Sequence, residues 1–444
     1  MPDIRLDRTF WPVGHGAFYT ERFYDHAGKR VFTAIYDCGS GRRWGKTSNG
    51  ANDASPKTVQ QLIESFLPSQ KTPNGVVVKD IDIAFVSHLH VDHINGLPTL
   101  LPRIKILVLP SLSDCRLLDA FLYNSIPEDV RNGEVPIAEI SDDSRADVES
   151  DVQSFILRLA NGEVENTVQV VPNDGEPPID PIDLERLDRD ITSGSAIRVP
   201  LPVGHNAFWI YKPVDADACS DDVRNAIIGA LQQHVPTGSI VDDAGKINWS
   251  KVREAVENAG LKAVIAIYET VFEIKDSSQH NNYSMPVYSG PDDSINVPHD
   301  WRHMDIHMDT FEAHGYIHSW CDIYPHPHHG VQIPLGIRCK LLSCLYMGDF
   351  NAKDDDKFSR LQKLLGGYYN RVGLQQVPHH FSDGNHRAEL YKGPLIAFGN
   401  ISGKKDRSYK QSVFDDIMNQ GCNPIIITKD RHDIVTFDYY MRLH

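Results

Sequence analysis

One short string of the sequence, SHLHVDHINGL, restricts the fold more than any other feature. It follows the apolar run IDIAFVS (81–87), which is typical of a short buried strand, and it contains His88, His90, Asp92 and His93. Side chains at i and i+2 of an extended segment point the same way, so the first two histidines can reach one ion. The turn that follows can direct Asp92 and His93 to a neighbouring ion. The string therefore predicts a metal site where a strand ends.

The types of ligand narrow the choice of metal. Neutral imidazoles together with a carboxylate suit Zn²⁺, and such donors also accept Mn²⁺ or Fe²⁺. The alternative is a polar loop with ordinary surface histidines, but an HxHxDH string directly after a strand rarely arises by chance. We therefore expect one or two divalent metal ions, with Zn²⁺ as the first choice and Mn²⁺ as the second.

The string HLHVDH resembles the signature of the metallo-β-lactamase superfamily. This resemblance implies an α/β (α+β) fold, a four-layer αββα sandwich with insertions, with metals at one edge of the sheets. Asp37 in IYDCGS resembles the early aspartate of the superfamily, and Asp349 in LYMGDF resembles the late aspartate that bridges two metals. His379 and His380 in VPHH resemble the final histidine motif.

A narrower resemblance is to the soluble hydrolase domain of ComEC, the bacterial DNA-uptake protein, and its free-standing relatives. The matching strings are VGHG (13–16), NNYS (281–284), VPHHFS (377–382) and the closing FDDIMNQGCNPIIITKDRHDIVTF. The sequence departs from these relatives at His15, where they carry glutamine, and in HHFS, where they carry HHGS. Substrate recognition is therefore expected to differ from theirs.

Two parts of the expected site stay open. A third histidine for the first metal is not evident, and His205, His280 or a histidine of the 299–329 region could supply it. The polar residues of NNYS would either hydrogen-bond around the site or form a structural turn. These are Asn281, Asn282 and Ser284.

The resemblance, carried over residue by residue, implies a set of metal ligands and two catalytic residues. The ligands are His88, His90, Asp92, His93, Asp349 and His379. Asp92 would also be catalytic by orienting the attacking water. One histidine of the VPHH pair would be a ligand, and the other would stabilise charge or protonate the leaving group. We take His379 as the ligand and His380 as the catalytic residue.

This chemistry predicts a metal-dependent hydrolase. A metal lowers the pKa of its bound water, and two bridged ions can clamp the attacking and leaving oxygens of a phosphodiester. We therefore expect a phosphodiesterase or nuclease, with a phosphodiester or a nucleic acid as substrate. The alternatives are a hydrolase of a small ester, lactone or amide, and a sensor or scaffold of the same fold. Nothing in the sequence indicates a protein partner.

The charge balance opposes broad binding of nucleic acid. The formal net charge is -16, whereas proteins that make many phosphate contacts usually carry a basic face. Two short basic runs could steer a phosphate locally, although solvated loops are the plainer interpretation. They comprise Arg42, Arg43 and Lys46, and Lys404, Lys405, Arg407 and Lys410.

We expect the 444 residues to form a single domain, 1–444, with insertions at about 214–261 and 290–335. The run AVIAIYETVFEI (263–274) is expected to be a strand. Eight histidines gather in the second insertion: His299, His303, His307, His314, His318, His326, His328 and His329. A helix would align the first three for a second metal site, but a loop or lid with solvated histidines is the plainer interpretation.

The sequence also bears on location. It has no apolar run near the ~20 residues that a membrane-spanning helix needs, and its opening lacks a signal-peptide layout. We expect a cytoplasmic protein that does not associate with membranes. The seven cysteines include no CxxC pair, so reduced and mostly buried thiols are expected.

Overall fold

The structure is a computed structural model of the chain. It describes residues 3–40, 63–64, 67–131, 135–141, 143–148, 150–201, 207–216, 220–272, 283–292, 304–308, 340–401, 410–428 and 434–442.

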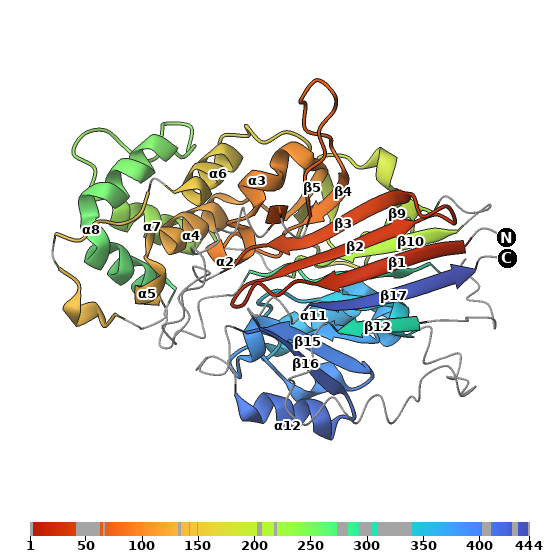
Figure 1. The fold of residues 1–444 in the computed structure, drawn as a ribbon. Helices are drawn as coiled ribbons and strands as arrows, with labels where there is room; N and C mark the ends of the chain where they lie inside the picture. Colours follow the sequence, from red (N-terminus) through yellow and green to blue (C-terminus); the bar gives the residue numbers. More distant parts are fainter. Residues whose placement is uncertain are drawn as a thin grey trace, which may run out of the picture.

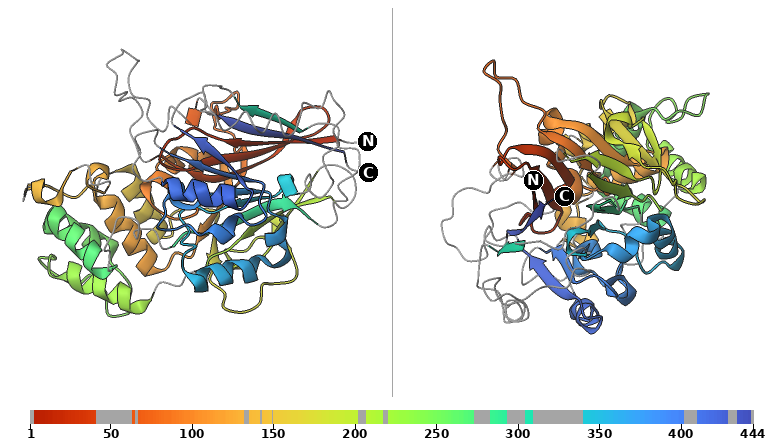
Figure 2. Two further views of the ribbon diagram at one scale, coloured as in Figure 1. Left: turned by 90° about the horizontal axis from the view of Figure 1, so that it is seen from below. Right: turned by 90° about the vertical axis from the view of Figure 1, so that its right-hand side faces the viewer.

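Among the described residues, nine strands form a first mixed sheet. In spatial order they are β12 (Met304–Met308), β17 (Val435–Arg442), β1 (Asp3–Phe10), β2 (Phe18–Tyr24), β3 (Arg30–Cys38), β4 (Ile81–Phe85), β5 (Ile104–Pro110), β6 (Thr167–Val171) and β8 (Asp190–Thr192). The pairs from β12 to β3 are antiparallel, and those from β3 to β8 are parallel. β1 and β17 thus join the two ends of the described chain, which lie side by side in Figures 1 and 2.

Eight further described strands form a second mixed sheet. Their order is β16 (Asn423–Ile427), β15 (Ile396–Asn400), β14 (Leu374–Gln376), β13 (Cys344–Tyr346), β11 (Val287–Pro291), β10 (Phe208–Pro213), β9 (Ile197–Pro200) and β7 (Ile182–Asp183). β13 to β16 run parallel, whereas β9, β10, β11 and β13 pair antiparallel. Side chains alternate between the two faces with the period of two expected of strands. On β10, Trp209 and Tyr211 face the first sheet, and Ile210 faces the outer helices.

Helices cover the outer face of each sheet (Figure 1). The described helices are α2 (Val91–Ile94), α3 (Leu97–Leu100), α4 (Asp114–Ser125), α5 (Glu128–Arg131), α6 (Asp151–Ala160), α7 (Asp221–Gln232), α8 (Trp249–Val271), α11 (Asp355–Leu365) and α12 (Gln411–Asn419). One buried core joins α3, α4, α6, α7 and α8 to the first sheet, a second lies between the sheets, and a third joins α11 and α12 to the second sheet. The expected four-layer αββα sandwich is confirmed.

The opening of the chain approaches the candidate site through a loop between two strands. Residues 11–17 form this loop, which joins β1 to β2. Gly14 and Gly16 lie in this loop with φ of 73° and 145°, conformations that glycine adopts without strain. The chain therefore reverses at VGHG and opens with three strands.

The expected strand at 263–274 is wrong, because α8 continues through this run to Val271. Its buried residues Leu261, Val264, Ile265 and Tyr268 are three or four apart, which is helical spacing. Gly260 (φ 75°) interrupts the helix and allows it to restart. The apolar composition suggested a strand, but the spacing matches a helix.

The helix considered for the start of the histidine-rich stretch is also wrong where the structure describes it. Residues 304–308 form β12, which pairs antiparallel with β17. Met304, Ile306 and Met308 repeat every second residue, as in a strand. His307 lies on β12, and the other seven histidines of the stretch fall outside the described residues.

Among the described cysteines, Cys38, Cys344 and Cys422 are buried free thiols, as expected. Cys115 is disulfide-bonded, so the expectation of reduced thiols is wrong there.

Candidate metal centre

The candidate site lies where strands of both sheets end at one edge of the sandwich. Asp37 is the penultimate residue of β3, and His88 follows the adjacent parallel strand β4. In the second sheet, Asp349 follows β13 and His380 follows the adjacent parallel β14. Because the carboxyl ends of parallel strands meet at one edge, this topology gathers residues that lie far apart in the sequence.

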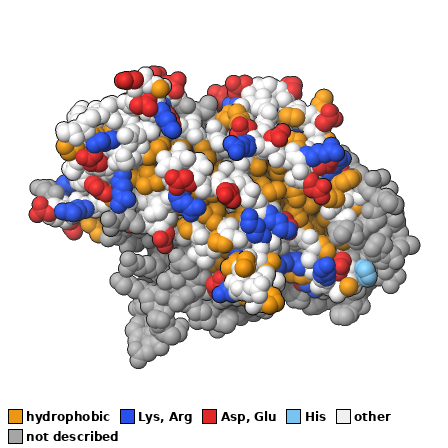
Figure 3. Space-filling view, turned by 90° about the horizontal axis from the view of Figure 1, so that it is seen from above, with side chains coloured by type: hydrophobic (Ala, Val, Ile, Leu, Met, Phe, Trp, Pro, Cys, Tyr) orange, Lys and Arg blue, Asp and Glu red, His pale blue; other side chains and the backbone are white. Residues whose placement is uncertain are grey.

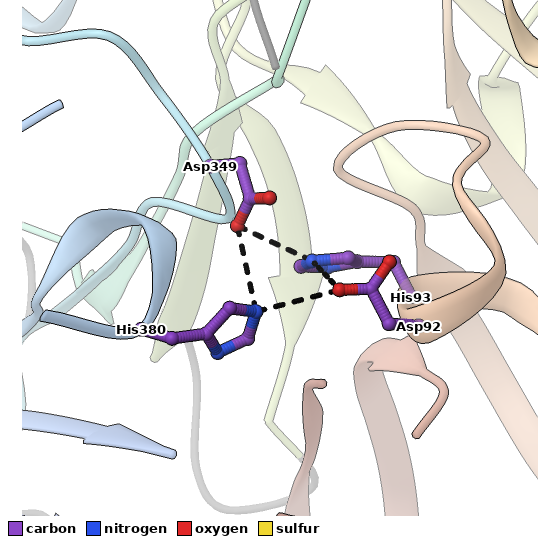
Figure 4. A group of neighbouring side chains, drawn as sticks. All are labelled: Asp92, His93, Asp349 and His380. Atoms are coloured by element: carbon purple, nitrogen blue, oxygen red, sulfur yellow. Dashed lines mark ion pairs between the residues drawn. The ribbon is translucent and has the colours of Figure 1, made fainter. Parts of the chain in front are cut away.

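Asp92, His93, Asp349 and His380 form a buried group whose ligand atoms all lie within 4.8 Å of one another (Figure 4). His93 Nε2 lies 3.3 Å from Asp349 Oδ1 and 3.7 Å from Asp92 Oδ2. His380 Nε2 lies 3.5 Å from Asp92 Oδ2 and 3.8 Å from Asp349 Oδ1. Two imidazoles and two carboxylates thus point at a common centre.

The hydrogen bonds around this group leave its inward-facing nitrogens available. His93 Nδ1 lies 2.8 Å from Asp37 Oδ2, and His380 Nδ1 lies 3.0 Å from the carbonyl oxygen of Asn400. The opposite nitrogens, Nε2 of both rings, are buried and have no hydrogen-bond partner among the described residues. Buried polar atoms are normally satisfied, so these atoms and the carboxylates around them fit a divalent cation.

Asp349 also faces a second pair of histidines. Its Oδ2 lies 3.7 Å from His88 Nε2 and 3.9 Å from His379 Nε2, whereas its Oδ1 faces His93 and His380. His88 Nδ1 lies 3.0 Å from Ser87 Oγ and 3.1 Å from Ser284 Oγ, and its Nε2 is buried without a hydrogen-bond partner in the part of the chain that the structure describes. The two carboxylate oxygens of Asp349 therefore face two different sets of imidazoles.

The remaining residue of the motif, His90, is held differently. Its ring centroid lies 4.5 Å from that of His88, yet its Nε2 is directed at Asp119 Oδ2, 3.6 Å away. The ring stacks on Tyr123 with centroids 3.6 Å apart. His90 is thus beside the centre without belonging to the group of four.

Charge and burial have opposite effects on the pKa of the two carboxyl groups in the centre. Burial alone would raise the pKa of both carboxyls, but neighbouring histidines hold the pKa of Asp92 and of Asp349 well below the usual range. Burial lowers the pKa of His88 well below its usual value, and the charges of His93 and His90 lower it further. Ionised carboxylates and a neutral His88 are the protonation states in which these groups bind metal.

The VGHG loop is packed tightly against this centre. A Cβ on Gly16 would lie 2.6 Å from the carbonyl oxygens of Asp92 and Gly39, so only glycine allows the approach. The loop brings His15 beside the site, with its ring centroid 4.1 Å from that of His380 and its Nε2 3.9 Å from Asp92 Oδ2. The side chain of His15 is 19% exposed, compared with 2% for His380.

The VPHH turn carries backbone strain. His379, His380 and Phe381 have φ of 46°, 52° and 64°, and non-glycine residues rarely adopt such values in succession. Each such residue costs about 1–3 kcal/mol and persists only where its surroundings fix it. The stacking of Phe381 on Phe414 and the bond of His380 to Asn400 supply this fixing.

Several residues around the centre were not predicted. Asn385 donates from Nδ2 to the carbonyl oxygen of Asp349 (2.7 Å), and its Oδ1 lies 3.1 Å from His379 Nδ1. Ser87 donates from both N and Oγ to Asp37. Only Ser87 had a local signal, since it directly precedes the histidine motif. Asn385, Asn400 and Asp119 reach the centre through tertiary packing alone.

Other candidates from the sequence fall outside the described residues. They are His205, His280, Asn281, Asn282 and all residues of the two basic runs except Lys410, which is exposed. Ser284 is buried, and its Oγ accepts a hydrogen bond from the backbone N–H of Asp349 (2.9 Å).

Residues 52–178 match the family described as "Beta-lactamase superfamily domain". They include the complete His88–His93 motif, β4, β5 and the helices that follow. This segment is therefore similar to metallo-β-lactamase superfamily domains. The match spans under a third of the chain, and the αββα layers extend the likeness in fold to the remaining described residues.

Two further comparisons add little. No curated protein matches the chain. Among solved structures, the chain is similar to the crystal structure of a long form RNase Z from yeast, with 8% sequence identity and a TM-score of 0.29. The alignment covers 90% of this chain and 36% of the yeast protein, so the chain spans about a third of that protein's length. No helix in the described part of the chain is long and apolar enough to span a membrane.

Proposed function

We propose that the protein is a metal-dependent hydrolase that cleaves phosphodiesters at a centre of two divalent ions. The observation that carries the proposal is Asp349, whose two oxygens face separate sets of histidines. One ion would be held by Asp92, His93, His380 and Asp349, and the other by His88, His90 and Asp349. In this assignment His380 is a ligand, and His379 lies on the His88 side as a further candidate.

Each side chain of the site would have a separate role in the reaction. When bound, the ions would supply an activated water and stabilise the charge that develops on the phosphate oxygens. Asp37 and Asn400 fix the rings of His93 and His380. Asp92 orients the attacking water through the oxygen that faces the centre. His15, the more exposed histidine of the VGHG loop, would contact the leaving group.

The charge of the protein favours local contact with a phosphodiester over a broad grip on a polyanion. The net charge is -16, and on the face drawn in Figure 3 the described acidic and basic side chains are interspersed. Zn²⁺ and Mn²⁺ both suit the donor set of imidazoles and carboxylates. A short or single-stranded nucleic acid or a cyclic nucleotide is therefore the preferred substrate class.

The test is hydrolysis by the full chain, stripped with chelator and reloaded with Zn²⁺ or Mn²⁺. Single-stranded DNA, RNA, cyclic nucleotides and bis(p-nitrophenyl) phosphate form the panel. We expect turnover of at least one, reduced by more than about 100-fold in Asp349→Asn and His380→Ala, because a charged ligand and an imidazole are lost. His26→Ala, in the exposed turn between β2 and β3, is the matched control and should keep wild-type turnover.

A small ester or lactone is the second candidate, favoured by the acidic charge, which repels anionic substrates. The same ligands would serve this reaction. Chromogenic esters and lactones belong in the same assay. Hydrolysis of these compounds with every phosphodiester left intact would replace the first proposal by the second.

A further inference from the structure

The HLHVDH motif does not reveal which ring nitrogen of His90 would bind an ion. Its Nε2 lies 3.6 Å from Oδ2 of Asp119, a carboxylate outside the group of four. Its Nδ1 is buried and has no hydrogen-bond partner in the described structure. One nitrogen thus has a carboxylate beside it, and the other is available to bind an ion.

Helix α4 presents Asp119 to this ring. Tyr123 lies four residues later on the same face of α4 and stacks on His90, with 12° between the ring planes. Asp119 thus lies at the edge of the imidazole ring, and Tyr123 covers its face. His90 and Asp119 also line a small cavity with His88, Arg116 and Tyr283.

The position of α4 is fixed near both ends. Near its start, Arg116 makes two hydrogen bonds to the carboxylate of Asp215, at 2.7 and 2.6 Å. Near its end, Asn124 Nδ2 donates to the carbonyl oxygen of Leu89, within the histidine motif itself (2.8 Å). The helix is therefore tied to the strand edge that carries His90, and Asp119 cannot shift along the ring.

Asp119 is itself held by a tyrosine of α8. Burial, followed by the charge and hydrogen bond of Asp119, raises the pKa of Tyr268 well above its usual value. The phenol is thus protonated and donates to the carboxylate. A chain of contacts runs from Tyr268 through Asp119 to His90.

We propose that Asp119 is a positioning residue for the first metal. Its carboxylate, 3.6 Å from His90 Nε2, favours a proton on that nitrogen, the tautomer that would leave the Nδ1 lone pair for the ion. A carboxylate that accepts the distal proton of a metal-bound histidine also raises the basicity of the ligand and fixes its orientation. This inference rests on the two-ion centre proposed above and assigns Asp119, which the sequence motifs do not include.

The test compares metal binding of the intact chain carrying Asp119→Ala or Asp119→Asn with that of the wild type. The matched control is Asp114→Asn, in the first turn of the same helix, where the side chain is 41% exposed and pairs with Arg224. Metal content per chain is measured after dialysis against buffers of defined free Zn²⁺. The tautomer of His90 is read from long-range ¹H–¹⁵N correlations of the ¹⁵N-histidine-labelled, Zn²⁺-loaded protein, assigned with His90→Gln.

We expect Asp119→Ala to weaken binding of one of the two ions by about 10–100-fold, the usual effect of losing such a carboxylate, and to leave the other ion unaffected. Asp119→Asn should keep most of the affinity, because its amide oxygen still accepts the Nε2 proton. In the wild type and in Asp119→Asn, His90 should carry its proton on Nε2.

Three results would overturn the inference. They are unchanged affinity in Asp119→Ala, a loss as large in Asp119→Asn as in Asp119→Ala, which would make Asp119 a direct ligand, and a His90 proton on Nδ1. The same measurements distinguish failure of this inference from failure of the proposed function. A wild-type chain that binds no metal contradicts both, whereas a chain that binds two ions but cleaves no substrate contradicts the function alone.

Discussion

Gly16 shows how strictly single residues determine the candidate centre. Its φ of 145° and the closeness of the carbonyl oxygens of Asp92 and Gly39 leave no room for a side chain. The backbone N–H of Ala17 donates to the same Asp92 oxygen (3.3 Å). The loop and the metal-binding turn thus support each other.

Gly16→Ala is therefore expected to displace Asp92 and to weaken metal binding by at least about 10-fold, the lower range for a disturbed ligand shell. Isothermal titration with Zn²⁺ measures the effect. Gly28→Ala is the control, because its φ of 75° is also positive but a Cβ there meets nothing within 4 Å. It should cost about 1 kcal/mol of stability and leave the affinity unchanged. Equal affinities in the two variants would contradict the expected role of the loop.

Sequence alone could indicate only part of the centre at this scale. His88 to His93 are recognisable because their ligand spacing is local. Asp349 and His380 required the resemblance, since nothing within their own segments distinguishes them from other aspartates and histidines. Asp119 and Asn400 could not be predicted, because an ordinary helix and an ordinary strand bring them to the site only through tertiary packing.

At the scale of elements, a buried ion pair joins strands across the interior. Arg8 on β1 and Glu21 on β2 lie between the sheets, with Arg8 Nε 2.8 Å from Glu21 Oε1. Glu21 also accepts hydrogen bonds from Tyr211, Ser289 and Tyr346 of the second sheet. This network fixes how the sheets face each other.

Glu21→Ala is expected to lower the free energy of unfolding by about 3–5 kcal/mol, because Arg8 would stay buried without its partner. Arg8→Met/Glu21→Leu should cost less than the single change, since neither charge remains. Guanidinium unfolding measures both. Lys105→Ala, which removes a surface pair with Asp82, is the control and should cost under about 1 kcal/mol. A double variant with a lower free energy of unfolding than Glu21→Ala would refute this account.

Lys212 of β10 introduces a pH dependence. Lys212 is buried beside the ring of Tyr368, and Arg371 contacts the same ring. Burial lowers the pKa of Lys212 to about 8 from 10.5. Between these values the unfolded chain binds more protons than the folded one, so this residue makes stability rise with pH across that window.

Lys212→Met should therefore be more stable than the wild type at pH 7, and the difference should shrink as the pH rises from about 8 toward 10.5. Urea unfolding at several pH values tests this. A difference that stays constant with pH would show that Lys212 is charged at no cost in the folded state.

The elements differ in how well sequence predicts them. The αββα layers were predictable through the resemblance of the HLHVDH string to the metallo-β-lactamase signature. The strand expected at 263–274 was wrong because the prediction followed the β-branched and aromatic composition of this run. The three- and four-residue spacing of its buried residues indicates a helix. The proposed extent of the domain, 1–444 with insertions at 214–261 and 290–335, stays a prediction. Of these segments, α7 and α8 pack on α4, and β12 adds a strand to the first sheet.

For the whole molecule, metal binding should be coupled to stability. Ligands from both sheets surround the centre, so an ion would bind the folded chain and not the unfolded one. Zn²⁺ at about 100 times its dissociation constant should add about 2.7 kcal/mol and raise Tm, and chelator should reverse this. Calorimetry measures the shift. Asp349→Ala should abolish most of it, and an unchanged Tm in the wild type would contradict the metal centre.

The pairing of β1 with β17 has a consequence for how the chain is made. During synthesis, β1 to β3 and the histidine motif emerge early, but the neighbour of β1 and the residues Asp349 and His380 emerge last. Contacts of such long sequence separation slow folding. Until β17 has been synthesised, the edge of β1 is exposed, and until the second sheet has been synthesised the nascent chain lacks Asp349 and His380 of the proposed ligands, so it depends on protection from aggregation during this interval.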